Sequence, residues 1–162
     1  MHTNRSTIFV ALMASGLIAL LSHQSFAADV VKVSLTDKGA AMEMPKDLGM
    51  GMGADMSKMT MAVVVDKTKV KAGEVTFQVT NNSKDLIHEM LVAPADPAKP
   101  LPFVEKDFRV DEEAAKDMGE VSELDPGKSG ALTITLAPGT YILFCNVAGH
   151  YMSGMWTLIT AE

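Results

Sequence analysis

The sequence predicts an all-β fold, an antiparallel sandwich or barrel of seven or eight short strands. Two observations support this prediction. Apolar and polar residues alternate over short stretches, as in the segment 75–80, where Val75, Phe77 and Val79 fall on one face. Turn-forming residues separate these stretches, as in Asn81-Asn82-Ser83 directly after that segment.

Seven strands are expected in order at residues 30–35, 61–65, 75–80, 87–93, 131–136, 140–145 and 155–160. The first, VVKVSL, is rich in β-branched residues, and the second, MAVVV, is a short apolar run. The strand 75–80 follows the turn sequence KAGE, and the strand 87–93, which begins with Ile87, follows a polar turn.

The C-terminal strands carry the same pattern. Leu132, Ile134 and Leu136 face one way in the segment 131–136. The dipeptide PG then turns the chain into the segment 140–145, where Tyr141 and Cys145 share a face. The last strand begins at the end of the sequence CNVAGHYMSGM and closes the domain.

One long connection interrupts the strands at residues 94–118. It carries four prolines, Pro94, Pro97, Pro100 and Pro102. An acidic stretch follows, in which Asp111 is placed to cap a short helix and Gly119 to end it. We interpret this stretch as a crossover connection within one domain, not as a second domain.

Residues 1–27 have the three-part plan of a secretory signal peptide, with Arg5, an apolar run and the cleavage pattern Ser25-Phe26-Ala27. The alternative is a retained membrane anchor, but the apolar run is short for a spanning helix. We expect residues 28–162 to form a single exported, periplasmic domain with no stable membrane insertion. Loss of Arg5 would change the formal net charge from −6 to −7, and such an acidic protein is not expected to bind nucleic acid.

The chain has a single cysteine, Cys145, so it cannot form an internal disulfide. After loss of residues 1–27, only His88 and His150 remain as histidines. Each of these residues alone is commonly a packed core residue. Together with Met155 they supply two imidazoles, one thiolate and one thioether, the ligands of a trigonal copper site used for electron transfer.

The spacing of these residues suits one site. Cys145 ends a strand, and the turn after it can return His150 to the same ion, with Gly149 permitting a tight backbone. Gly154 has the same role before Met155, which favours Met155 over Met152 as the thioether ligand.

At these residues the chain resembles the cupredoxins, the small blue copper proteins of the plastocyanin and azurin superfamily. The resemblance rests on VKAGEVTFQVTNNS, HEMLV, LAPGTYILFC and CNVAGHYMSGM, and its C-x₄-H-x₄-M spacing is that of rusticyanin-like and auracyanin-like members. It implies a Greek-key β-sandwich of about eight strands, here with a Met-rich insertion and one short helix. It also implies His88, Cys145 and His150 as equatorial ligands of one type 1 copper, and Met155 as axial ligand.

Two features depart from the family or extend it. Many blue copper proteins have an asparagine after the first histidine, but this chain has Glu89, which puts the hydrogen bond to the Cys145 sulfur in doubt. A carboxylate near the copper, as in red copper variants, is an alternative, although a regular strand would point Glu89 away from His88. His88 and Met90 also form an H-x-M pair like those of periplasmic copper chaperones, with core packing as the alternative for Met90.

The segment 41–61 holds seven of the thirteen methionines, including Met42, Met44, Met50 and Met52. Thioethers bind Cu(I), so these four residues are candidates for an additional, exchangeable Cu(I) site. The alternative is that they pack over one end of the sandwich.

We expect the protein to carry single electrons between redox partners such as a cytochrome or an oxidase, as a monomer and not as an enzyme. The alternative is a Cys145–His150 dyad for hydrolytic catalysis. The second hypothesis is copper handling, in which the Met-rich segment delivers or stores Cu(I) or confers resistance.

Overall fold

The computed structural model describes residues 28–38 and 60–162. The predicted signal peptide therefore lies outside the described residues, as do Met42, Met44, Met50 and Met52. Among the residues that are described, no helix has the length and apolar character needed to cross a membrane.

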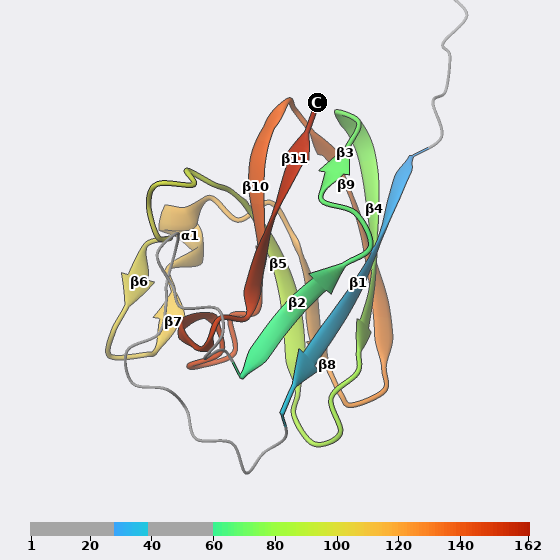
Figure 1. The fold of residues 1–162 in the computed structure, drawn as a ribbon. Coiled ribbons are helices and arrows are strands. Elements are labelled where there is room, and N and C mark those ends of the chain that lie inside the picture. Colours follow the sequence, from blue (N-terminus) through green and yellow to red (C-terminus); the bar gives the residue numbers. More distant parts are fainter. Residues whose placement is uncertain (1–27, 39–59) are drawn as a thin grey trace, which may run out of the picture.

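Eleven strands form two main sheets and one small hairpin in the described residues (Figure 1). The first sheet has the order β2(Met61–Val65), β1(Asp29–Asp37), β4(Gly73–Asn81), β9(Ser129–Leu136). The second has the order β3(Lys69–Val70), β11(Trp156–Ala161), β10(Gly139–Phe144), β5(His88–Pro94), β8(Glu120–Leu124). The hairpin pairs β6(Phe103–Val104) with β7(Arg109–Val110).

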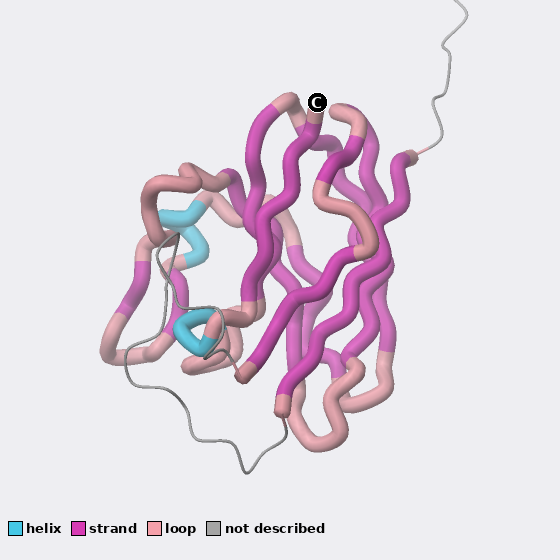
Figure 2. Tube along the Cα trace, viewed as in Figure 1, coloured by secondary structure: helices cyan, strands magenta, loops and turns pink. Residues whose placement is uncertain are grey.

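The two sheets pack face to face as a β-sandwich, which confirms the predicted fold class (Figures 1 and 2). Most neighbouring strands are antiparallel, but β1 pairs with β4 and β11 pairs with β3 in parallel. Parallel neighbours require long connections between strands, so residues far apart in sequence meet inside the sandwich.

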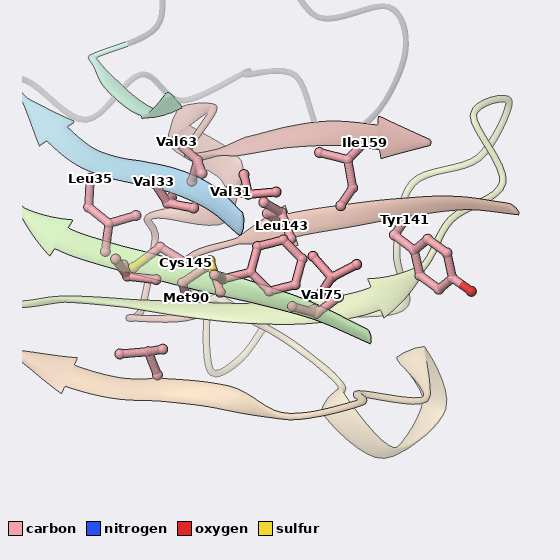
Figure 3. Close-up of a cluster of buried hydrophobic side chains, with 14 of the residues drawn as sticks. Val31, Val33, Leu35, Val63, Val75, Met90, Tyr141, Leu143, Cys145 and Ile159 are labelled. Atoms are coloured by element: carbon pink, nitrogen blue, oxygen red, sulfur yellow. The ribbon is translucent and has the colours of Figure 1, made fainter. Parts of the chain in front are cut away.

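The inner faces form one continuous core that includes residues of both sheets, among them Val33, Phe77 and Leu143. The alternation predicted for residues 75–80 is confirmed, since Val75, Phe77 and Val79 are all buried. Cys145 belongs to this core, and Figure 3 shows its side chain among the apolar side chains that fill the space between the sheets.

The connection predicted as a crossover covers the outer face of the second sheet. Leu101, Val110 and Ala115 from this connection form a second buried cluster with Phe144 and Tyr151. In Figure 1, β6, β7 and α1(Glu112–Ala115) lie to one side of β10 and β11. The second sheet is therefore buried on both faces, which explains why β5 is buried at six successive positions from its first residue.

The short helix is present, with Asp111 at its start as predicted. The Asp111 carboxylate accepts a hydrogen bond from the Ala114 N–H at 3.0 Å. The prediction that Gly119 ends the helix is wrong, because the helix stops at Lys116, which has a left-handed backbone with φ 59°. The N–H of Lys116 bonds to the Glu113 carbonyl, so this residue closes the last turn itself.

Candidate metal centre

The four predicted ligands come together at one end of the second sheet. His88 is the first residue of β5, Cys145 directly follows β10, and Met155 directly precedes β11. Because β5 and β11 both pair antiparallel with β10, the start of each lies beside the end of β10. His150 lies in the segment that joins β10 to β11, before the 3₁₀ turn η2(Tyr151–Ser153).

Three donor atoms from His88, Cys145 and His150 lie within 4.8 Å of one another. The two Nδ1 atoms are 3.1 Å apart, and the Cys145 Sγ is 3.3 Å from Nδ1 of His150 and 3.9 Å from Nδ1 of His88. A metal ion lies about 2.0–2.1 Å from imidazole nitrogen and about 2.3 Å from thiolate sulfur, so donors around one ion are separated by roughly 3–4 Å. The three side chains are buried and their spacing fits one metal ion.

The segment between Cys145 and Met155 is held by backbone hydrogen bonds. The Cys145 N–H donates to the Met155 carbonyl at 3.0 Å, and the Met155 N–H donates to the His150 carbonyl at 3.1 Å. Gly149 and Gly154 have φ values of 84° and 86°, as their predicted roles require. Met155 is fully buried and its backbone bonds to Cys145 and His150, whereas Met152 is partly exposed within η2.

The Cys145 sulfur accepts a backbone hydrogen bond from the Glu89 N–H at 3.4 Å. The strand pairing of β5 with β8 shifts by one residue between His88 and Met90, where Ser122 and Glu123 of β8 lie opposite the single residue Glu89, so the irregularity is on β8. The hydrogen bond to the Cys145 sulfur therefore does not require an asparagine at position 89, because the backbone N–H of Glu89 donates it. Met90 is fully buried and belongs to the central core.

The Glu89 carboxyl group is itself buried, and its Oε1 atom has no hydrogen-bond partner among the described residues. Burial raises the pKa of this carboxyl to about 7, with a further contribution from the charge of Glu120. Its oxygens are not part of the three-atom donor cluster.

Burial also determines the protonation of the predicted ligands in the metal-free protein. It raises the pKa of the Cys145 thiol to about 12 and lowers the pKa of His150 to about 4, with help from the neighbouring His88. The pKa of His88 is lowered as well, because burial outweighs the opposing effect of Asp37. Near neutral pH the two imidazoles are therefore neutral, which is the form that binds metals.

One residue of the site was missed by the sequence analysis. Oδ2 of Asp37, at the end of β1, lies 2.8 Å from Nε2 of His88, and both side chains are almost completely buried. Nothing in the sequence distinguished this carboxylate from a surface residue at a strand end. Only the packing of one sheet on the other brings it to His88.

Asn146, which follows Cys145, fixes the ligand segment to the connection that covers the sheet. Its Oδ1 accepts from the Val110 N–H at 2.6 Å, and its Nδ2 donates to the Val110 carbonyl and to Oε1 of Glu112. The Gly149 N–H donates to the Phe108 carbonyl at 2.8 Å. The connection 94–118 therefore supports the metal-binding segment from its outer side.

Comparison with known sequences gives one family. The sequence profile described as "Cupredoxin-like domain" matches residues 56–158, which is more than half of the chain. A search of curated proteins gave no significant match.

Solved structures share the fold at low sequence identity. Rusticyanin from Thiobacillus ferrooxidans is 16% identical, with a TM-score of 0.52, over 85% of this chain and 80% of rusticyanin. Auracyanin B is 20% identical, with a TM-score of 0.52, over 83% of this chain and 89% of auracyanin B. Auracyanin A, described as a "blue" copper protein from Chloroflexus aurantiacus, is 19% identical, with a TM-score of 0.50, over 84% of this chain and all of its own.

Proposed function

The chain belongs to the cupredoxin-like domain family, and on that basis we propose that it binds one type 1 copper ion and carries single electrons between redox proteins. The observation that carries this proposal is the buried cluster of His88, Cys145 and His150 donor atoms. Its combination of one thiolate with two imidazoles matches the equatorial ligands of blue copper sites. The copper assigned to auracyanin A by its description supports the same metal here.

In this proposal His88, Cys145 and His150 hold the copper ion and Met155 is its axial ligand. Copper supplies one-electron chemistry by cycling between Cu(II) and Cu(I), with the soft sulfur ligands suiting Cu(I) and the imidazoles suiting both states. Backbone N–H groups of Glu89 and Val147 hydrogen-bond the Cys145 sulfur and hold it in one orientation. The surrounding core excludes water, and a site filled by four protein ligands has no open position for a substrate. The protein is thus a carrier and not an enzyme.

The partner is proposed to be a redox protein such as a cytochrome or an oxidase, which docks near His150. Ile87, directly before His88, and Phe108, whose carbonyl bonds to Gly149, are large exposed apolar side chains next to the ligand segments. Apolar surface of this kind suits a short-lived protein contact. The proposal also places the protein in the periplasm as a monomer, after cleavage of the signal peptide at residues 1–27.

The test is a titration of the metal-free protein with Cu(II), followed by visible absorption and EPR. An intense thiolate-to-copper band with narrow copper hyperfine splitting is expected, and Cys145→Ser should abolish both. Met90→Leu is the matched control, because it removes a buried sulfur from the same core without touching the donor cluster, and it should keep the band. Copper bound without a thiolate-to-copper band would contradict the proposal, and a red, tetragonal spectrum would bring Glu89 or water into the coordination shell.

A second proposed function is copper handling by the Met-rich segment. The observation that favours it is the position of the segment's two described ends. The Lys38 N–H bonds to the Thr60 carbonyl at 3.1 Å, and the adjacent Asp37 contacts His88. The segment therefore leaves and re-enters the sandwich beside the proposed copper centre.

This second function predicts that the protein binds more than one Cu(I). Replacement of Met42, Met44, Met50 and Met52 by leucine should reduce the Cu(I) stoichiometry to one, measured by competition with a chromogenic Cu(I) chelator. A stoichiometry of one in the unchanged protein would reject copper handling by this segment. It would leave the electron-transfer proposal intact.

A further inference from the structure

Asp37 is a buried carboxylate that reaches from one sheet of the sandwich to the other. It is the last residue of β1, where it pairs with Met61 of β2 in the first sheet. Its side chain is 1% exposed, and its Oδ2 lies 2.8 Å from Nε2 of His88 in the second sheet. A buried charge is costly unless it is hydrogen-bonded, so this contact is a built part of the core and not a surface ion pair.

The contact determines which nitrogen of His88 is available to a metal ion. An ionised carboxylate only accepts hydrogen bonds, so the proton of the neutral His88 ring lies on Nε2, facing Asp37. The lone pair is then on Nδ1, the atom that lies 3.1 Å from Nδ1 of His150 and 3.9 Å from the Cys145 sulfur. Asp37 thus turns the metal-binding nitrogen of His88 toward the other two donors.

His150 provides a contrast within the same site. In the part of the chain that the structure describes, the hydrogen bonds of the His150 ring are made by Nδ1. The His88 ring is therefore bonded to a carboxylate on the side away from the cluster, whereas the His150 ring contacts the other two donors of the cluster. The two imidazoles are unequal before any metal binds.

We propose that Asp37 is a positioning residue of the metal centre, which fixes the Nε2–H tautomer of His88 and whose negative charge favours Cu(II) over Cu(I). The second part rests on the proposed function. A carboxylate bonded to a ligating histidine orients the ring and makes it a stronger donor. Within the buried surroundings its charge is weakly screened, and it stabilises the more positive oxidation state of a nearby ion.

The first test uses the metal-free protein, and ¹⁵N NMR of the assigned His88 ring is the readout. The wild-type ring is expected in the Nε2–H form. Asp37→Asn keeps an acceptor oxygen and should keep this tautomer, whereas Asp37→Ala should produce a mixture of tautomers. An Nδ1–H ring in the wild type, or a tautomer ratio that Asp37→Ala leaves unchanged, would overturn the positioning role.

The second test measures the reduction potential of the copper-loaded protein. Asp37→Asn should lower the ratio of Cu(II) to Cu(I) affinity at least tenfold, which raises the potential by about 59 mV or more for a one-electron couple. Asp29→Asn is the matched control. It removes the same charge from the other end of the same strand, about 26 Å away, where Asp29 pairs with Lys67.

The results separate the two proposals. An equal shift in both variants, or no shift in Asp37→Asn, would overturn the role of the Asp37 charge. If the wild type forms no thiolate-to-copper band, the proposed function fails. The NMR result on the metal-free protein would still decide whether Asp37 positions His88.

Discussion

The backbone N–H of Glu89 points at the Cys145 sulfur across 3.4 Å, while the side chain of the same residue buries a carboxyl group that lacks a partner at Oε1. Glu89 lies where the pairing of β5 with β8 shifts by one residue, with the extra residue on β8. The backbone contribution to the sulfur is independent of the side chain. Substitution of Glu89 can therefore be used to examine the buried carboxyl separately.

Glu89→Gln should stabilise the metal-free protein relative to the wild type, and this stabilisation should be larger at pH 8 than at pH 5. The pKa of Glu89 is about 7 in the folded protein and 4.5 in the reference state. Its contribution to stability is therefore fully present below pH 4.5 and is lost as the pH rises through 7. The difference in unfolding free energy between variant and wild type should grow by about 2–3 kcal/mol from pH 5 to pH 8. Urea unfolding at both pH values measures it, and a difference independent of pH would contradict the buried ionisation.

Binding of Cu(II) at pH 7.5 should release about one proton per metal ion. The proton comes from Cys145, whose thiol has a pKa of about 12 in the metal-free protein, while His150, with a pKa of about 4, has none to give. Calorimetry in buffers of different ionisation enthalpy measures the number. The apparent affinity should rise about tenfold for each pH unit near neutrality. Cys145→Ser should release no proton, and release of a proton by that variant would rule out the thiol as its source.

Met155→Leu should keep the thiolate-to-copper band and raise the reduction potential. Leucine fills a similar volume, so the cost in stability should be below about 1.5 kcal/mol. The axial ligand tunes the reduction potential of such a site. Its loss would leave three donors, a coordination number that Cu(I) accepts more readily than Cu(II). The matched control is Met152→Leu, in the partly exposed turn η2. A larger shift of the reduction potential in Met152→Leu than in Met155→Leu would make Met152, and not Met155, the axial ligand.

Gly130→Ala should destabilise the sandwich by about 1–3 kcal/mol. Gly130 lies on β9, and an added Cβ would come within 2.5 Å of Cγ1 of Val121 on β8. Val121 is β-branched and cannot rotate freely out of the way. Gly139→Ala on β10 is the control, because its added Cβ would meet Tyr141 only at 3.8 Å. Urea unfolding compares the two, and an equal effect would refute the close approach of β8 to β9.

Much of the fold could be predicted from the sequence because its main strands are amphipathic. The seven expected strands are all present, with ends that differ by at most two residues. The remaining strands were not expected. Three of them, β3, β6 and β7, have two residues each, which is too short for a periodic pattern. β8 has only Val121 strongly buried, so no alternation marks it.

The candidate metal centre likewise contains some residues that could be predicted from the sequence and others that could not. The residues brought together by the structure around Cys145 could be named because cysteine and histidine are rare in this chain and glycines mark the turns between them. Asp37 and the shift in strand pairing opposite Glu89 could not be predicted. The role of Asp37 depends on the stacking of two sheets, and the shift depends on how β5 pairs with β8, so neither leaves a local pattern in the sequence.

The order of the donors along the chain has a consequence for biosynthesis. Asp37 and His88 precede Cys145 by more than fifty residues, whereas Cys145 and His150 lie only five residues apart. A ribosome, which synthesises the chain from its N-terminus, therefore completes the first histidine and its carboxylate long before the thiolate. The three-atom donor cluster cannot form until residue 150 has been made, so a shorter nascent chain has no site for the metal ion.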